Sequence, residues 1–166
     1  MCGIVGFAAS GQLRVDRLPL AMAALQHRGP DGHGESIEGQ VALGHTRLSI
    51  IDLEGGAQPL RSPCGRYVLI ANGEIYNHVE LRQELSALGA QFLTGSDCEV
   101  ILQGYALWGR NVLDRIDGMY AFALQDIQQG EVLLARDPLG MKPLYWTESA
   151  DLDGSVRNIL EKTWRN

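Results

Sequence analysis

The chain has 166 residues, of which 45% are apolar and 20% charged, and these values are typical of a single globular domain with a sizeable core. Its formal net charge of −6 argues against a nucleic-acid surface or an anionic membrane as partner. No apolar run approaches the ~20 residues that a membrane span requires, and the N-terminus lacks the features of a signal peptide.

The cysteine and histidine content indicates neither a disulfide scaffold nor a metal site. The three cysteines, Cys2, Cys64 and Cys98, are an odd number without a CxxC pair, and this usage is typical of a reducing compartment. We therefore expect a cytoplasmic protein. The four histidines have no HExxH or other metal-ligand spacing, so we expect no metal.

Short strands and helices alternate along the chain without a linker. Apolar runs predict strands, and helical apolar spacing after Asp16, Asn77 and Ser96 or Asp97 predicts helices capped by these residues. In chain order, the predicted elements are a strand at 4–9, a helix at 16–25, two strands within 35–51 that turn near 38–39, a strand at 67–71, helices at 77–88 and 96–108, a hairpin of 119–125 with 131–135, and a strand at 144–146. Hairpin-linked strands with two adjacent helices indicate an α+β fold with antiparallel sheets.

Cys2 directly follows Met1, and a small second residue permits removal of that methionine. Removal would leave Cys2 with a free α-amine, whose reference pKa of roughly 7.7–8.0 keeps a useful fraction neutral near pH 7. The amine could then accept the thiol proton while the sulfur attacks a carbonyl, as in N-terminal hydrolases. The alternative is a packed and chemically inert cysteine.

An Asn-Gly pair follows the predicted strand at 67–71. The Gly73 amide has no side chain to block a ligand, and the Asn72 carboxamide supplies a second donor beside it. Two such donors could hold the oxyanion of a tetrahedral intermediate. The alternative is a tight hairpin turn, for which Asn-Gly is a common signal.

Three charged residues suit a free amino acid as ligand. Arg47 lies in an otherwise apolar predicted strand, and its planar guanidinium matches an α-carboxylate. Asp97 and Glu74 could hold an α-ammonium group. The alternatives are a surface ion pair for Arg47 and a simple helix cap for Asp97.

Several long motifs occur together in a fixed order. They are MCGIVG at 1–6, HRGPDG at 27–32, GHTRLSI at 44–50, NGEIYN at 72–77, GSDCEV at 95–100, DGMYAFA at 117–123 and RDPLG at 136–140. This set resembles the amidotransferase domain of glutamine-dependent asparagine synthetases, a class II (Ntn-type) glutaminase. The resemblance covers residues 2–146 as one domain and leaves 147–166 as an atypical C-terminal tail.

The resemblance implies a four-layer αββα sandwich that hydrolyses glutamine to glutamate and ammonia through a Cys2 thioester. Cys2 would be the nucleophile, with its α-amine as base, and the Asn72 side chain and Gly73 N–H would form the oxyanion hole. Arg47 would bind the glutamine carboxylate, and Asp97 and Glu74 its amino group. The remaining pocket-lining residues implied by the resemblance are Leu48, Ile50 and Ile51.

The chain departs from the family pattern after Trp146. The last strand of the family is expected to be missing, and the tail offers a short helix with Ile159 and Leu160 on one side. The Ser-Gly-Gly-x-Asp-Ser phosphate loop of the synthetase part is absent, so asparagine synthesis by this chain alone is not expected. ATP and magnesium would belong to a separate synthetase chain or domain, and this domain would need no cofactor besides its substrate L-glutamine.

Three functions stay open at this point. The first is an active glutaminase that supplies ammonia to a synthetase on a separate chain. The second is a truncated or partner-dependent fragment with little activity of its own. The third is a non-catalytic glutamine-binding module, against which stands the presence of every expected catalytic residue.

Overall fold

The computed structural model describes residues 1–49 and 55–147, together with the backbone of 159–160. Its elements, in chain order, are β1 (Gly3–Ala8), η1 (Val15–Arg17), α1 (Leu18–Ala24), η2 (Gln26–Arg28), β2 (Gly32–Glu38), β3 (Val41–Arg47), β4 (Leu60–Arg61), β5 (Tyr67–Ile75), α2 (His78–Ala87), α3 (Glu99–Trp108), η3 (Gly109–Asp114), β6 (Gly118–Asp126), β7 (Glu131–Arg136) and β8 (Ile159–Leu160).

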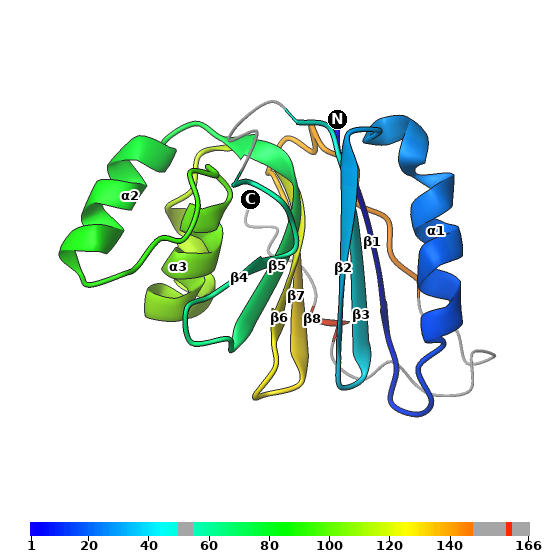
Figure 1. Ribbon diagram of the computed structural model, residues 1–166. Helices are drawn as coiled ribbons and strands as arrows, with labels where there is room; N and C mark the ends of the chain where they lie inside the picture. Colours follow the sequence, from blue (N-terminus) through cyan, green and yellow to red (C-terminus); the bar gives the residue numbers. More distant parts are fainter. Residues whose placement is uncertain (50–54, 148–158, 161–166) are drawn as a thin grey trace.

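Two sheets stacked face to face form the centre of the molecule (Figure 1). The three-stranded sheet has the order β1-β3-β2, and the five-stranded sheet has the order β4-β5-β6-β7-β8. Helix α1 covers the outer face of the first sheet, and α2 and α3 cover the outer face of the second (Figure 1). The fold is therefore the αββα sandwich that the sequence predicts.

The alternation of side chains along the strands decides which residues enter the space between the sheets. Val41 and Leu43 of β3 join Val68 and Ile70 of β5 in the inter-sheet core, and Ile4 of β1 packs against them. Even-numbered residues of β1 and β5, and odd-numbered residues of β3, consequently point between the sheets. This parity also applies to the polar residues at the strand ends.

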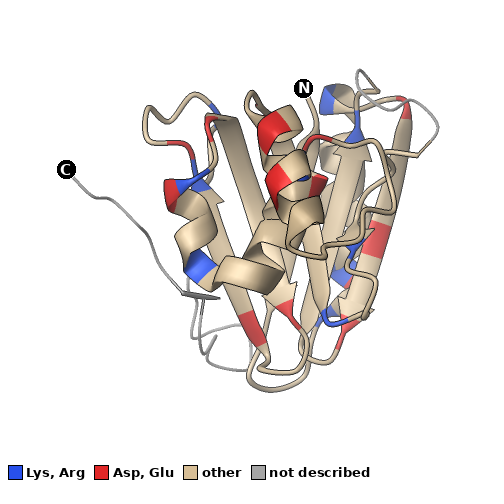
Figure 2. Ribbon diagram, turned by 90° about the vertical axis from the view of Figure 1, so that its left-hand side faces the viewer, with Lys and Arg blue, Asp and Glu red and all other residues tan. Residues whose placement is uncertain are grey.

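An arginine in the turn before β6 contacts both α2 and α3. The Arg115 guanidinium pairs with Glu84 of α2 at 2.7 Å and lies over the Trp108 ring of α3, 4.1 Å from its centroid. Figure 2 shows acidic and basic positions interspersed on this face of the molecule. The pairing links both helices to one corner of the five-stranded sheet.

None of the predicted side-chain caps of α1, α2 and α3 is formed. The Asn77 side chain does not cap α2, because it donates to the Arg115 carbonyl at 2.8 Å and accepts from the Asp117 N–H at 2.9 Å. Asp16 lies in η1, where its carboxylate pairs with Arg14 instead of capping α1. The partners of Asn77 lie about 40 residues further along the chain, so the local pattern around α2 carries no sign of them.

The prediction for the end of the chain is wrong in two places. Residues 144–146, expected as a strand, belong to none. Ile159 and Leu160, expected in a short helix, form β8, which pairs in parallel with Val132 and Leu133 of β7. The other strand pairs are antiparallel, as predicted.

Within the described part of the chain, no helix combines the length and the apolar character needed to cross a bilayer.

Candidate functional site

Cys2 lies immediately before β1, and its thiol meets the backbone of the residue that follows β3. The Leu48 N–H donates to Cys2 Sγ at 3.4 Å, and the thiol donates to the Leu48 carbonyl at 3.7 Å. The Cys2 carbonyl accepts a hydrogen bond from Arg28 Nε at 3.1 Å. The thiol and the carbonyl of Cys2 are thus both hydrogen-bonded, and its side chain is half-buried.

The loop of the HRGPDG motif packs directly on the end of β3. A Cβ atom on Gly29 would lie 2.5 Å from the Arg47 backbone nitrogen, a separation that no side chain tolerates. The Asp31 carboxylate also accepts the Ser49 N–H at 2.8 Å. Glycine at position 29 therefore lets the loop hold the segment that carries Arg47 and Leu48 against Cys2.

Strand parity brings the predicted side chains to one place. Cys2 continues the inward-facing row of β1, Arg47 that of β3, and Asn72 and Glu74 that of β5. The first residues of β1 and the last residues of β3 and β5 lie at the same end of the two sheets (Figure 1). Asn72 is buried, Arg47 half-buried and Glu74 exposed, so the group runs from the interior to the surface.

The Asn72-Gly73 pair forms no hairpin turn, because β5 continues through it to Ile75. The Ala71 N–H and C=O point away from β6 toward Gln58, and the Ile75 N–H points to Asp97. Since these directions alternate along a strand, the N–H of Gly73, between Ala71 and Ile75, also points away from β6. No described residue accepts a hydrogen bond from it.

Gly73 is required by the approach of β6. A Cβ atom at this position would lie 2.5 Å from the Met119 carbonyl oxygen and 2.8 Å from Tyr120 Cα. Any side chain here would push the two central strands of the sheet apart.

Asp97 does not act as a simple helix cap. Cys98, not Asp97, is the residue that precedes α3, and the Asp97 carboxylate instead accepts the Ile75 N–H at 2.7 Å. Asp97 is buried with 5% of its surface exposed. The structure therefore brings this carboxylate to the edge of β5 at Ile75, two residues after Gly73.

Cys98 is buried in the core, with 3% of its surface exposed. Burial raises the pKa of its thiol well above the usual value, and the negative charge of Asp97 and the nearby Cys2 and Glu74 raise it further. Cys64, in contrast, is exposed.

His45 lies on the inward face of β3, two residues before Arg47, and only 1% of it is exposed. Neither ring nitrogen has a hydrogen-bond partner among the described residues. Burial lowers the pKa of His45 to about 4, the nearby Ala71 carbonyl opposes this shift, and Arg47 adds to it. The ring is consequently neutral near pH 7.

The structure thus places most of the predicted residues together. Cys2, Leu48, Asn72 and Gly73 lie at one end of the sheets with the three charged residues. Ile50 and Ile51 lie outside the described residues. The sequence did not predict the roles of Arg28 and Gln58, which hydrogen-bond the backbones of Cys2 and Ala71 respectively. The only signal was that Arg28 is a polar residue next to Gly29 and Gln58 a polar residue next to Pro59.

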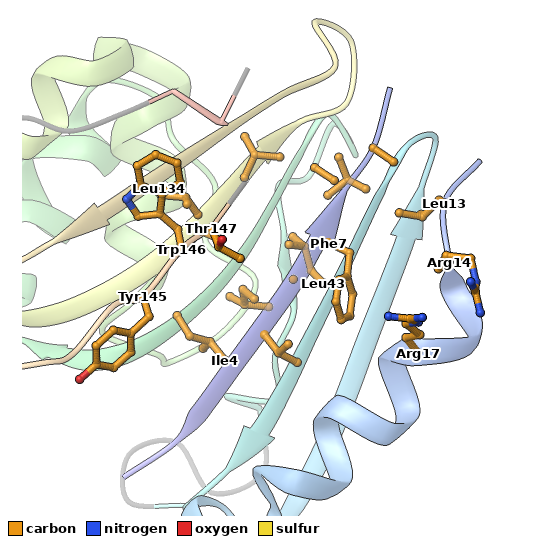
Figure 3. A pocket seen from close by; sticks show the side chains of 18 of the residues that line it. Ile4, Phe7, Leu13, Arg14, Arg17, Leu43, Leu134, Tyr145, Trp146 and Thr147 are labelled. Carbon is orange, nitrogen blue, oxygen red and sulfur yellow. The ribbon is translucent and has the colours of Figure 1, made fainter. Parts of the chain in front are cut away.

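A separate, mostly apolar groove lies elsewhere (Figure 3). It has a volume of about 430 Å³ and runs between β1 and β7, beside residues 144–147. Ile4 and Leu43 line one part, Leu134 and Trp146 another, while Arg17 stands at the rim (Figure 3). Cys2 does not line it, so this groove is separate from the cluster of predicted catalytic residues.

Comparison with known proteins identifies the family. Residues 1–157 match the family described as "Glutamine amidotransferase domain". The glutamine-hydrolysing asparagine synthetase B of Escherichia coli is 45% identical over 151 residues, which cover 87% of this chain and 26% of that protein. The glutamine-hydrolysing asparagine synthetase 1 of Bacillus subtilis is 41% identical over 163 residues, which cover 91% of this chain and 25% of that protein. This chain therefore spans about a quarter of the length of these relatives.

Solved structures share the fold. The glutamine phosphoribosylpyrophosphate amidotransferase of B. subtilis matches with a TM-score of 0.71 at 24% sequence identity, over 86% of this chain and 38% of that one. With the family match over most of its length and two sheets that bring Cys2, Asn72 and Gly73 to one end, this chain belongs to the glutamine amidotransferase domain family.

Proposed function

We propose that this chain is the glutaminase half of an asparagine-synthetase-like amidotransferase and hydrolyses L-glutamine to glutamate and ammonia. The observation that carries the proposal is the meeting of three strand ends. Cys2 Sγ contacts the backbone of Leu48, directly after β3. The Gly73 N–H of β5 points away from β6 and has no acceptor among the described residues. A nucleophile and an oxyanion donor at one end of the sandwich are what acyl transfer needs.

Before the reaction, Met1 must be removed. Its exposed fraction of 56% leaves it accessible for removal. The freed α-amine of Cys2 takes the thiol proton, and the sulfur attacks the carboxamide carbon of glutamine. The negative charge moves to the carboxamide oxygen, where the Asn72 side chain and the Gly73 N–H donate hydrogen bonds. Each such donor is worth about 3 kcal/mol in the transition state.

Collapse of this intermediate breaks the C–N bond, and the leaving nitrogen takes the proton from the α-amine and departs as ammonia. A thioester between Cys2 and the glutamyl group remains. Water, deprotonated by the same amine, attacks the thioester carbon through a second oxyanion in the same hole. Release of glutamate returns the proton to the Cys2 thiolate and restores the enzyme.

Charged residues around the nucleophile hold the amino-acid end of the substrate. In this proposal Arg47 pairs with the α-carboxylate, and Asp97 with Glu74 holds the α-ammonium. The resemblance assigns Leu48 to the pocket lining through its backbone groups, together with Ile50 and Ile51, which lie outside the described residues. The burial of Asp97 supports this assignment, because a carboxylate shielded from water attracts an ammonium more strongly than an exposed one.

The ammonia would pass to an acceptor activated by a separate, ATP- and magnesium-dependent synthetase chain or domain in the cytoplasm. The relatives whose names include asparagine synthesis are about four times as long as the matched region, which supports a division of labour between two parts. In this division residues 2–146 are the amidotransferase domain and 147–166 a distinct tail.

The test combines mass spectrometry with an activity assay. The purified chain is treated with 6-diazo-5-oxo-norleucine, a glutamine-like electrophile, and glutamate release is measured in parallel. Loss of Met1, one adduct on Cys2 and glutamate release support the proposal. Cys64, which is exposed, serves as the internal control for unspecific alkylation. An adduct on neither cysteine, or glutamine binding without turnover, would favour the non-catalytic or partner-dependent fragment.

A further inference from the structure

The peptide group of Ala71, next to the Asn72-Gly73 pair, is held by one side chain from a distant part of the sequence. Gln58 Oε1 accepts the Ala71 N–H at 2.6 Å, and Gln58 Nε2 donates to the Ala71 carbonyl at 3.1 Å. Strand β4 pairs with β5 only at Leu69 and Val68. At Ala71, the last residue before the Asn72-Gly73 pair, the Gln58 carboxamide therefore makes the two hydrogen bonds that a neighbouring strand would make.

The main chain of Gln58 is fixed on the opposite sheet. A Cβ atom on Gly34 of β2 would collide with the Gln58 carbonyl oxygen and would approach Pro59 Cδ to 3.1 Å. Only glycine permits this close contact. Gln58 thus rests with its backbone on the three-stranded sheet and reaches with its side chain to the five-stranded sheet.

We infer that Gln58 is a positioning residue that sets Asn72 and Gly73 at the correct distance from Cys2. The inference rests on the proposed function, in which β5 supplies the oxyanion donors and β1 the nucleophile. These groups belong to different sheets, so their separation depends on what holds the sheets in register at this end. Gln58 joins the two sheets one residue before the Asn72-Gly73 pair.

A carboxamide is required because Ala71 presents one donor and one acceptor side by side. Ala71 is buried with 1% of its surface exposed, so both of its backbone groups need partners within the protein. Glutamine satisfies both with one planar group, whereas glutamate satisfies only the N–H and leucine satisfies neither. The buried, neutral His45 ring also lies near the Ala71 carbonyl.

The expected effect is a loss of turnover without a loss of substrate binding. Oxyanion donors displaced by a fraction of an ångström stabilise the transition state less, and a displacement of about 1 Å costs on the order of a hundredfold. Gln58 lies outside the residues proposed to touch glutamine. We therefore expect kcat of the Gln58→Leu variant to fall by about tenfold or more, with KM changed by less than about twofold.

The experiment compares the wild-type chain with Gln58→Leu, Gln58→Glu and the control Gln129→Leu, which changes an exposed glutamine in the β6–β7 turn. Glutamate release gives kcat and KM for each variant. Gln58→Glu lacks the donor to the Ala71 carbonyl only while it is ionised. Its kcat relative to wild type should therefore recover as the pH falls toward the carboxyl pKa, about 4.3 for a free glutamate, because protonation restores an O–H donor.

Hydrogen exchange of the Ala71 amide is measured on the same samples and reports the contact without turnover. Faster exchange at Ala71 in Gln58→Leu, with the lowered kcat, supports the inference. Wild-type kcat in Gln58→Leu, or a raised KM with unchanged kcat, overturns it. If Gln58→Leu does not fold, the pH dependence of Gln58→Glu decides. A wild-type chain that releases no glutamate contradicts the proposed function and, with it, the catalytic part of this inference, while the exchange data still show whether Gln58 holds β5.

Discussion

The carboxylate of Asp97 accepts a hydrogen bond from the Ile75 N–H at 2.7 Å, and this contact joins the loop before α3 to the last residue of β5. Asp97 is thereby part of both the scaffold and the candidate site. Its charge and its hydrogen bond can be separated by substitution, because asparagine keeps the acceptor oxygen and loses the negative charge.

We predict that Asp97→Asn folds normally and raises KM for glutamine by about tenfold or more, since an α-ammonium loses its buried counter-charge. Asp97→Ala should in addition lower the free energy of unfolding by about 1–3 kcal/mol, because the Ile75 N–H loses its acceptor. Denaturant unfolding and steady-state kinetics measure the two effects. Asp114→Asn, at an exposed position, is the control, and an unchanged KM in Asp97→Asn would exclude the ammonium role.

Substitution of the nucleophile should separate chemistry from binding. Cys2→Ala is expected to abolish glutamate release while calorimetry still detects glutamine binding, because Arg47 and the acidic residues remain. Cys64→Ala changes an exposed thiol and should leave the rate unaltered. Undiminished ammonia release by Cys2→Ala would show that another group attacks the substrate.

The close contact at Gly73 predicts a double effect for Gly73→Ala. The new methyl group would meet the Met119 carbonyl and Tyr120 Cα, so β5 and β6 must separate. We expect a loss of about 1–3 kcal/mol in the free energy of unfolding and a fall in kcat of on the order of a hundredfold. Gly32→Ala is the matched control, because nothing lies within 4 Å of a Cβ atom there. If Gly73→Ala matched Gly32→Ala in stability and kcat, the close approach of β6 would not be the reason for glycine at position 73.

Arg47 should affect binding more than turnover. Truncation in Arg47→Ala is expected to raise KM for glutamine by about tenfold or more, since a bidentate partner of the carboxylate is lost. Arg47→Lys should have a KM between those of wild type and Arg47→Ala, because lysine keeps the charge without the planar fork. Arg17→Ala, which removes an exposed arginine, controls for net charge. A KM for Arg47→Ala equal to that of wild type would refute the carboxylate role.

His45 predicts how stability depends on pH. Burial lowers its pKa from 6.5 to about 4, so between these values the unfolded chain binds a proton that the folded protein excludes. Its contribution is complete above about pH 6.5 and is lost as the pH falls toward 4, by up to about 3 kcal/mol. Urea unfolding at a series of pH values should show a weaker dependence in His45→Gln. An identical slope in both proteins would mean that the ring is solvated or paired in the folded state.

The motifs and their order determined much of this protein. The position of Cys2, the strand that carries Arg47 and the Asn72-Gly73 pair were all readable because strand parity and glycine requirements are properties of short stretches of chain. The alternation of apolar runs indicated an α+β fold with antiparallel sheets, and the family resemblance implied the αββα layering.

The tertiary structure decided which groups those residues meet. Asp97 and Asn77, read as helix caps, instead bind backbone groups of Ile75, Arg115 and Asp117. Gln58 carries no motif that points to Ala71. The pairing of Ile159 with β7 is likewise invisible in the tail. Side-chain hydrogen bonds to distant backbone and the pairing of strand edges depend on how the sheets come together, and no periodicity within a single segment encodes them.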